Sequence, residues 1–311
     1  MSSSTTGLLV LGNQLFDVSF LTEHKIGPVF LREDIELCTY FKFHKLKIQF
    51  FLLAMRKYAR ELTDAGFAVT YQELDPSERN YESYLSAWIK ESGITKICFY
   101  EIEDKFFETR IKDCVKATGI ECEILPSPMF ITSRKNFESY LAKVQRPFLQ
   151  EFYELQRRRL KILISQEGRP TGGRWSFDEF NRKPLPKDVV PPKVAWSSGD
   201  ASPDHTEQSL AVRALCEKHF KEHPGIDGTL WLPTSRDGAL HWLNEFVKQR
   251  LENFGPYEDA LTERSDVVFH SALTPFLNTG LLTPALVVKA VLAEARLRKL
   301  PIESVEGFIR Q

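Results

Sequence analysis

Carboxylate and amide side chains gather directly after the short apolar segments in the first third of the chain. They are Gly12-Asn13-Gln14, then Glu33, Asp34 and Glu36, then Glu73 and Asp75, then Glu101 and Glu103. Such oxygens accept hydrogen bonds from hydroxyl and ring N–H groups and repel phosphate. Neither a G-x-G-x-x-G motif nor a P-loop is present, so a dinucleotide bound in the usual way is not expected here. The pattern favours an uncharged polyol or heterocycle as ligand; the alternative is a set of solvated loop residues.

A second distinctive region is basic. Residues 134–187 hold 13 Lys or Arg against six Asp or Glu, whereas residues 75–125 hold seven against 11. Positive charge with interleaved Tyr153 and Trp175 is typical of a surface that faces a phosphate backbone. The candidate DNA-binding residues are Arg157, Arg158, Arg159, Arg174 and Arg182. A solvated helix face with structural arginine pairs is the alternative for the run of three arginines.

The stretch from Phe269 to Gly280 carries helix-start signals. Thr274 followed by Pro275 is an N-cap with proline at the first helical position, and Thr283 followed by Pro284 repeats the pattern. A helix start preceded by His270 and Ser271 offers N–H and hydroxyl groups to an anionic phosphate. An ordinary corner between two helices is the alternative.

Other site chemistries lack support in the sequence. The five cysteines, at 38, 98, 114, 122 and 216, are odd in number and form no C-x-x-C pair, so no disulfide framework, zinc site or iron–sulfur site is indicated. No H-E-x-x-H motif and no nucleophile elbow occur, which leaves metal-dependent and serine hydrolases unsupported. We therefore expect no bound metal and reduced thiols.

The elements that must position these residues fall into two classes. The first 125 residues alternate between strands, expected at 8–11, 29–31, 69–71, 96–100 and 122–125, and helices, expected at 36–65, 81–91 and 105–117. This alternation predicts an α/β domain with a parallel five-stranded, Rossmann-like sheet, in which ligands bind beyond the carboxyl ends of the strands. Helices are next expected at 132–141 and 147–164, followed by a proline-rich connector. From Glu207 onward the pattern is helical. The predicted domains are 1–130, 131–205 and 206–311.

Composition sets the class of protein. The chain has 311 residues, 42% hydrophobic and 27% charged, with a formal net charge of -1. These values are ordinary for a globular protein and exclude a globally basic nucleic-acid protein. No run of 18 apolar residues and no secretory leader is found, so we expect a cytoplasmic protein without a membrane span.

Five stretches in collinear order between Leu8 and Gln311 match one known family. They are Leu9-Val10-Leu11-Gly12-Asn13-Gln14-Leu15, Phe43-His44-Lys45-Leu46-Lys47-Ile48, Gly172 to Asp178 with Asn181-Arg182-Lys183, His270 to Leu282, and Ser304 to Gln311. The chain resembles the photolyase and cryptochrome family, in the photolyase-related branch that includes the bacterial iron–sulfur (6-4) photolyases. The resemblance implies an α/β antenna domain followed by an all-α domain that binds FAD.

The resemblance also implies particular ligands. The antenna pigment of the branch is a ribityllumazine, and Gly12, Asn13, Glu36 and His44 are the positions that would line its site. The FAD phosphates would be wrapped by His270, Ser271, Leu273 and Thr274, with Tyr257 nearby; His270 stands where the family usually has Thr, and Asn13 where it often has Asp. No catalytic residue is assigned.

The implied activity is light-driven DNA repair. In the family, reduced FAD, excited by light, passes an electron to a pyrimidine photoproduct flipped out of damaged DNA, so the enzyme is a carbon–carbon lyase. The (6-4) type is our interpretation, although these residues do not distinguish it from a cyclobutane-dimer enzyme. The alternatives are a cryptochrome-like photoreceptor and a non-catalytic protein that binds only pigment or DNA.

The family continues beyond Gly-Phe-Ile-Arg-Gln with a Trp-Arg-Glu motif, the flavin-ring pocket and four cysteines that hold an iron–sulfur cluster. We therefore interpret this chain as an N-terminal portion, truncated at the C-terminus, that binds FAD poorly and is inactive alone. A full-length protein would be monomeric. Self-association is expected of this chain if Leu281, Leu286, Val288 and Leu292 form an exposed apolar face.

Overall fold

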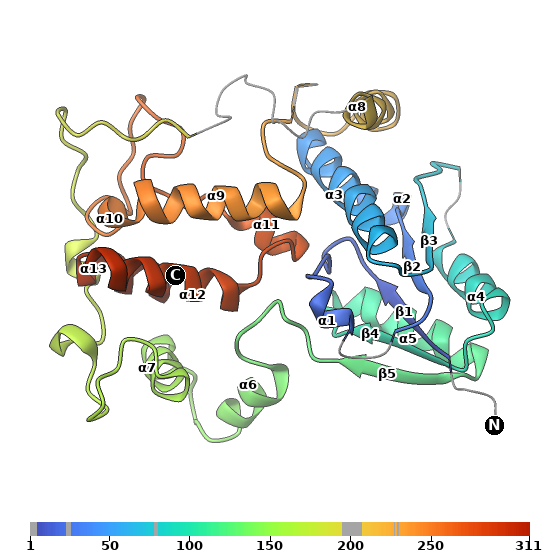
Figure 1. The fold of residues 1–311 in the computed structure, drawn as a ribbon, viewed down its shortest axis with the longest axis horizontal. Coiled ribbons are helices and arrows are strands. Elements are labelled where there is room, and N and C mark those ends of the chain that lie inside the picture. The colour runs from blue at the N-terminus through green and yellow to red at the C-terminus, as the bar shows by residue number, and fades with distance from the viewer. Residues whose placement is uncertain (1–4, 23–25, 78–79, 195–206, 227, 229) are drawn as a thin grey trace. The chain divides into compact units, whose positions relative to one another are not determined.

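The computed structural model describes residues 5–22, 26–77, 80–194, 207–226, 228 and 230–311 (Figure 1). These residues form two compact units, each assembled from separate stretches of chain. The α/β unit contains the described residues of 1–129, 196–239 and 276–282, and the helical unit contains those of 130–195, 240–275 and 283–311. The three-domain division at 130 and 205 stays a prediction, and its second boundary lies outside the described residues.

A five-stranded parallel sheet forms the centre of the α/β unit, as the sequence predicts. Its strands are β1 (Thr6–Val10), β2 (Val29–Arg32), β3 (Val69–Gln72), β4 (Lys96–Tyr100) and β5 (Glu121–Leu125), in the order β3-β2-β1-β4-β5. Leu8 of β1 pairs with Val29 of β2 on one side and with Cys98 of β4 on the other. The three central strands are almost wholly buried, whereas most residues of the edge strand β5 are exposed. The central strands are buried on both faces of the sheet, which explains why their sequences are continuously apolar.

Helices cover the sheet and supply its core. The helices of this part are α1 (Ser19–Thr22), α2 (Ile35–Thr39), α3 (Lys45–Asp64), α4 (Tyr81–Glu91) and α5 (Lys105–Thr118). Trp88 and Leu85 of α4 and Phe107 of α5 pack with Phe30 and Phe99 of the sheet in one buried cluster. This packing fixes the carboxyl ends of β1 and β4, the neighbouring strands from which the chain continues to opposite sides of the sheet.

The single long helix expected over 36–65 is wrong, because the chain leaves helical geometry between α2 and α3. His44 has φ −59° and ψ 136° and caps the start of α3. The backbone N–H of Lys45 donates to the Pro224 carbonyl, 3.0 Å away. A tertiary contact to a distant segment therefore interrupts a stretch whose periodicity alone is helical.

Two later stretches complete the α/β unit. Helix α8 (Glu207–His219) packs against α3. Arg236, at the start of α9 (Arg236–Gln249), donates to the carbonyls of Leu15 and Leu281 at 2.8 and 2.9 Å. Leu281 is only 3% exposed, so it does not belong to an exposed apolar face as expected; Leu286 is 39% exposed, and Val288 and Leu292 are half-buried.

Every regular element of the helical unit is a helix in the part that the structure describes, apart from one isolated bridge between Ile164 and Pro170. The elements are α6 (Arg134–Leu141), α7 (Leu149–Leu160), η1 (Thr171–Gly173), η2 (Asp178–Phe180), most of α9, α10 (Leu251–Phe254), the start of α11 (Thr274–Thr279), α12 (Pro284–Arg298) and α13 (Ile302–Arg310). Helix α7 is shorter than the expected 147–164 because Lys161 adopts a left-handed conformation that ends it. None of the described helices has the length and apolar character needed to cross a membrane.

Candidate functional site

Gln14 is buried at the carboxyl ends of β1 and β4. Its side-chain Nε2 donates to the carbonyls of Tyr100 and Glu101, at 3.4 and 3.0 Å. Its Oε1 is buried and has no hydrogen-bond partner among the described residues. A buried acceptor without a donor is costly, so this oxygen marks a place where a ligand N–H or O–H would be stabilised.

Gly12 and Asn13 precede Gln14 in the same loop, and both are half-buried. A Cβ on Gly12 would lie 2.7 Å from Sδ of Met55 in α3, so the loop approaches that helix closely enough to require glycine. The Asn13 side chain makes no hydrogen bond with the described residues and stays available at the crevice.

The acidic residues after β2 differ sharply in their surroundings. Glu33 is 1% exposed and accepts hydrogen bonds from Arg56, the Tyr71 hydroxyl and the Leu74 N–H, so it stabilises the fold rather than binding a ligand. Asp34 caps α2 by accepting from Leu37 N at 2.9 Å, while its Oδ2 is buried and has no hydrogen-bond partner in the part of the chain that the structure describes. Burial raises the pKa of Asp34. The sequence analysis does not include Asp34 among the predicted pigment residues, and only its buried Oδ2 distinguishes it.

Glu36 and His44 complete the predicted pigment set, and each already has a partner. Glu36 is half-buried and forms an ion pair with Arg110, Oε2 to Nη2 3.0 Å, which leaves Oε1 available. His44 is exposed, and its Nδ1 accepts from Leu46 N at 3.1 Å to cap α3. A Cβ added to Gly225 would lie 2.3 Å from Nε2 of His44, so the ring packs directly on that backbone. His44 therefore has a structural role that spacing alone did not indicate.

The segment from Val267 to Thr274 forms the candidate phosphate site in the helical unit. Val268 and Ala272 have φ of 52° and 51°, a left-handed conformation that is costly for a β-branched residue. Leu273 is buried, whereas His270 and Thr274 are exposed and Ser271 is half-buried. The indole Nε1 of Trp242 donates to the Ser271 carbonyl at 2.9 Å, and this hydrogen bond holds the segment against α9. Strain at two flanking residues is typical of a binding segment.

A cavity of about 520 Å³ opens beside this segment. Its lining residues are Ala260, Leu261, Thr262, Glu263, Ser265, Asp266, Val268 and His270. Glu263 and Asp266 give it acidic character, which suits sugar hydroxyls better than phosphate oxygens. Tyr257 does not line it; its half-buried ring packs at 5.6 Å from the ring of Phe269.

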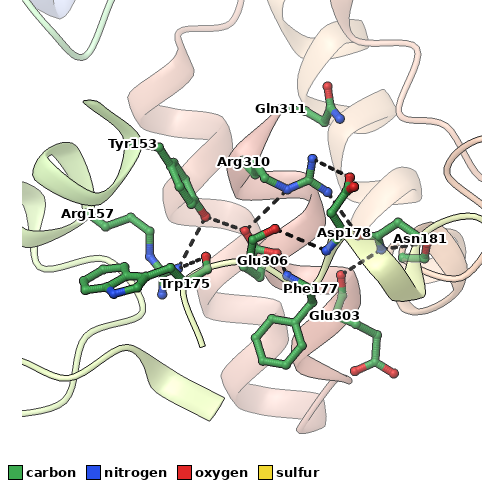
Figure 2. Close-up of polar contacts among 12 residues, drawn as sticks. Tyr153, Arg157, Trp175, Phe177, Asp178, Asn181, Glu303, Glu306, Arg310 and Gln311 are labelled. Atoms are coloured by element: carbon green, nitrogen blue, oxygen red, sulfur yellow. Dashed lines mark hydrogen bonds and ion pairs between the residues drawn. The ribbon is translucent and has the colours of Figure 1, made fainter. Parts of the chain in front are cut away.

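The candidate DNA-binding arginines divide into one buried and four exposed residues. Arg157 is 2% exposed, and its guanidinium donates to the carbonyls of Ile162 and Leu163 at 3.3 and 2.7 Å. It also donates to the Trp175 carbonyl at 2.7 Å (Figure 2). The expectation that Arg157 contacts a phosphate does not fit this geometry, because its donors are used inside the fold. Arg158 is exposed and lies 4.3 Å from the ring centroid of Trp175.

The three other arginines are also exposed. Arg159 donates to Gln156 and to the Ile131 carbonyl, and Arg174 and Arg182 form ion pairs with Glu179 and Asp178. Exposed pairs of this kind are weak and exchange readily for a phosphate.

A buried polar network joins the connector to α13, and the sequence did not identify it (Figure 2). Glu306 is 0% exposed; its carboxylate accepts from the Tyr153 hydroxyl at 2.7 Å and from Phe177 N at 2.8 Å. Arg310 contacts Asp178 and Asn181, and Asn181 Nδ2 also donates to the Gly255 carbonyl. In the sequence, the motifs around Asn181 and Ser304 indicated only a resemblance to the family. In the structure, their contacts hold segments of the helical unit together.

The cysteines and the other potential metal ligands are the next feature of the structure. All five cysteines are free thiols, and no group of three or more His, Cys, Asp or Glu with metal-binding geometry occurs among the described residues. Burial raises the pKa of Cys98 to about 12 and also raises that of Cys114. These thiols are therefore protonated at neutral pH and poor nucleophiles.

Comparison with known proteins finds a photolyase and an uncharacterized viral protein among the proteins similar to this chain. The chain is 29% identical over 309 residues to a (6-4) photolyase of Agrobacterium fabrum, across 98% of this chain and 60% of that protein. It is 26% identical over 191 residues to uncharacterized protein R852 of Acanthamoeba polyphaga mimivirus, which covers 58% of this chain and 95% of the viral protein. The chain thus spans about 60% of the length of the curated photolyase it matches.

The fold has a solved counterpart. The crystal structure of a bacterial class III photolyase from Agrobacterium tumefaciens covers 100% of this chain and aligns over 57% of its own length, with a TM-score of 0.54 and 16% identity. A family model described as deoxyribodipyrimidine photo-lyase-related protein matches residues 8–231, which is more than half of the chain. A parallel α/β sheet with an orphaned acceptor at its crevice, a helical region and this match together place the protein in the deoxyribodipyrimidine photo-lyase-related family.

Proposed function

We propose that this protein is a light-driven DNA-repair flavoprotein of the (6-4) photolyase kind. The observation that carries the proposal is the segment from Val267 to Thr274, which is held in a strained conformation with polar side chains outward. The collinear similarity to a (6-4) photolyase over 98% of the chain supports the same assignment. FAD, when bound, supplies the light-driven electron that splits a pyrimidine lesion.

The helical unit is proposed to hold FAD through its non-reacting half. The Ser271 and Thr274 hydroxyls and His270 are suited to phosphate oxygens, and the acidic cavity beside His270 is suited to sugar hydroxyls. Leu273 anchors the segment in the core, and Tyr257 supports it by packing on Phe269.

The crevice of the α/β unit is proposed to hold an antenna pigment of the ribityllumazine class. Gln14 Oε1 and Asp34 Oδ2 are buried acceptors that find no hydrogen-bond partner within the described residues, and Asn13 and Glu36 lie next to them in the sequence. A ring with N–H groups and a chain of hydroxyls would satisfy these acceptors. The crevice offers Gly12 for close approach but no P-loop for a phosphate.

A titration with 6,7-dimethyl-8-ribityllumazine tests the pigment site. Binding is expected to change the pigment's fluorescence, and Gln14→Leu and Glu36→Ala are expected to weaken binding by about tenfold each, the effect of losing one buried hydrogen bond. Glu91→Ala on α4 is the control. No fluorescence change at tens of micromolar pigment, or equal binding by all variants, contradicts the pigment assignment.

The DNA-facing surface is proposed to include Arg158, Arg159, Arg174 and Arg182. Binding of a duplex that carries a (6-4) photoproduct is expected to be tighter than binding of the undamaged duplex. Arg174→Ala with Arg182→Ala is expected to lower the slope of log affinity against log salt by roughly two, since each lost phosphate contact removes about 0.9. Lys90→Ala on α4 is the charge control. An unchanged slope would assign both arginines to their ion pairs with Glu179 and Asp178.

A further inference from the structure

Arg110 of α5 forms ion pairs with two carboxylates of the α/β unit. Its Nε and Nη2 donate to Glu82 of α4 at 2.6 and 3.0 Å, and Nη2 also donates to Glu36 of α2 at 3.0 Å. The side chains of Arg110, Glu82 and Glu36 are 30%, 32% and 35% exposed. Ion pairs with this exposure contribute little to stability, so the main effect of the network is on the orientation of the three side chains.

Two contacts hold the Arg110 guanidinium in place. The first is the pair of hydrogen bonds to both oxygens of Glu82, the forked geometry that a guanidinium favours. This hydrogen bonding lowers the pKa of Glu82, so the carboxylate is ionised at neutral pH. The second contact is with Phe107, whose ring centroid lies 5.5 Å from the guanidinium and whose side chain is buried in the core. Arg110 is therefore fixed before any ligand binds.

Glu36 is the part of this network that belongs to the predicted pigment set. It lies in the first turn of α2, which has only five residues. Its Oε2 accepts from Arg110, whereas its Oε1 makes no hydrogen bond with the residues that the structure describes. Arg110 gives two hydrogen bonds to Glu82 and one to Glu36, so Glu36 keeps a strong acceptor for a ligand N–H or O–H. A carboxylate that is already fixed loses little further side-chain freedom when a ligand binds.

We propose that Arg110 is a positioning residue of the pigment site, which holds the Glu36 carboxylate in the orientation that accepts a hydrogen bond from the ligand. This inference rests on the proposed function, because Glu36 is assigned to the pigment there. Arg110 acts through Glu36 and has no contact of its own with the ligand. Glu82 fixes Arg110 in turn, so three helices, α2, α4 and α5, share in orienting one acceptor. Glu36 and Glu82 precede Arg110 by 74 and 28 residues, so no local sequence pattern indicates this role.

The test is a double-mutant cycle on the affinity for 6,7-dimethyl-8-ribityllumazine, measured by fluorescence titration. Arg110→Met keeps the apolar stem and removes the charge, and it should weaken binding by about fivefold, the effect of immobilising one more side chain on binding. In the Glu36→Gln background the same substitution should leave the affinity unchanged, because the carboxylate that Arg110 orients is already absent. Arg110→Lys keeps the positive charge and should recover part of the loss.

Two further variants make the test specific. Glu82→Gln weakens the hold on Arg110 from the other side and should also lower the affinity only when Glu36 is present. The matched control is Lys112→Met, which removes another cation of α5, one paired with Glu108 at 2.9 Å. This control should bind the pigment as tightly as wild type. Far-ultraviolet circular dichroism checks that each variant is folded under the conditions of the titration.

The outcomes separate this inference from the proposed function. Equal pigment binding by wild type and Arg110→Met overturns the role of Arg110 and leaves the pigment assignment standing. An equal loss of affinity with and without the Glu36 carboxylate also overturns it, because Arg110 then acts only through the stability of the fold. Wild type that does not bind the pigment overturns the pigment assignment and, with it, the role of Arg110. A loss that requires Glu36 and is partly recovered by Arg110→Lys supports the inference.

Discussion

Arg157 and Arg159 are two residues apart in α7 and lie in opposite environments. Arg157 is enclosed and its donors bind three backbone carbonyls, whereas Arg159 is exposed. In the run Arg157-Arg158-Arg159, the first side chain therefore stabilises the fold, whereas the other two lie on the surface. Composition alone assigns the same role to all three.

Arg157→Ala is expected to lower the free energy of unfolding by at least about 3 kcal/mol, because three buried carbonyls lose a charged donor. Arg159→Ala should cost less than about 1 kcal/mol, as exposed substitutions usually do. Urea denaturation monitored by tryptophan fluorescence measures both. Equal losses for the two variants would show that burial of Arg157 has no energetic weight.

Asp34 gives a pH-dependent prediction. Burial raises its pKa in the folded chain above the ordinary 3.8, so the native state binds the proton more tightly than the unfolded state. Stability contributed by the protonated form is therefore lost as the pH rises through the folded pKa. At pH 7 the charged carboxylate carries the full burial penalty.

Asp34→Asn retains an N-cap for α2 and removes the buried charge. The variant should melt above wild type at pH 7, and the difference should shrink as the pH falls through the raised folded pKa toward the ordinary value of 3.8. Melting temperatures between pH 3.5 and 8, a range that follows from that value, test this. A difference that is constant with pH would mean that Asp34 does not titrate with folding.

At the scale of elements, local signals and tertiary contacts set different helix ends. The start of α12 follows the sequence: Thr283 accepts from Leu286 N at 3.4 Å, and Pro284 occupies the first turn. The start of α3 does not, because His44 and the contact of Lys45 with Pro224 interrupt an apolar period that continues across the break. A cap that uses neighbouring residues is readable from sequence, whereas one fixed by a distant strand of chain is not.

Thr283→Ala should lower stability by about 1 kcal/mol, the usual cost of losing an N-cap. Thr283→Ser keeps the hydroxyl and should lose only a small part of this. Helical circular dichroism during urea denaturation provides the measurement. A loss as large in the serine variant would assign the effect to the missing methyl group.

At the scale of the whole molecule, the helical unit depends on polar contacts between segments far apart in sequence. The Glu306 carboxylate in α13 accepts hydrogen bonds from the Tyr153 hydroxyl of α7 and from the Phe177 N–H of the connector (Figure 2). Arg310 lies beside it, with Nε 3.5 Å from Oε1 of Glu306. Burial raises the pKa of Glu258 in the same network. These contacts hold α13 to the stretches around Tyr153 and Phe177, each of which precedes Glu306 by more than a hundred residues.

Glu306→Ala should destabilise the chain by about 2–5 kcal/mol, because the Tyr153 hydroxyl and the Phe177 N–H both lose their acceptor. Combined with Tyr153→Phe it should show a coupling energy of about 0.5–3 kcal/mol, since the two side chains share one hydrogen bond. A double-mutant cycle in urea measures this coupling. Strict additivity would place the Tyr153 hydroxyl outside the network.

The sequence by itself determined the five strands of the α/β unit, their alternation with helices, the helical character after Glu207 and the family. Strong periodicity, glycine stops and the cap at Thr283 are local, and local physics suffices for them. Only the tertiary structure decided which chemically similar residues are accessible. It enclosed Arg157, Glu33 and Arg250, left Arg159 exposed, and gave His44 a capping role. Burial depends on contacts between distant segments, and the residue types near one position do not by themselves reveal which distant residues it will contact.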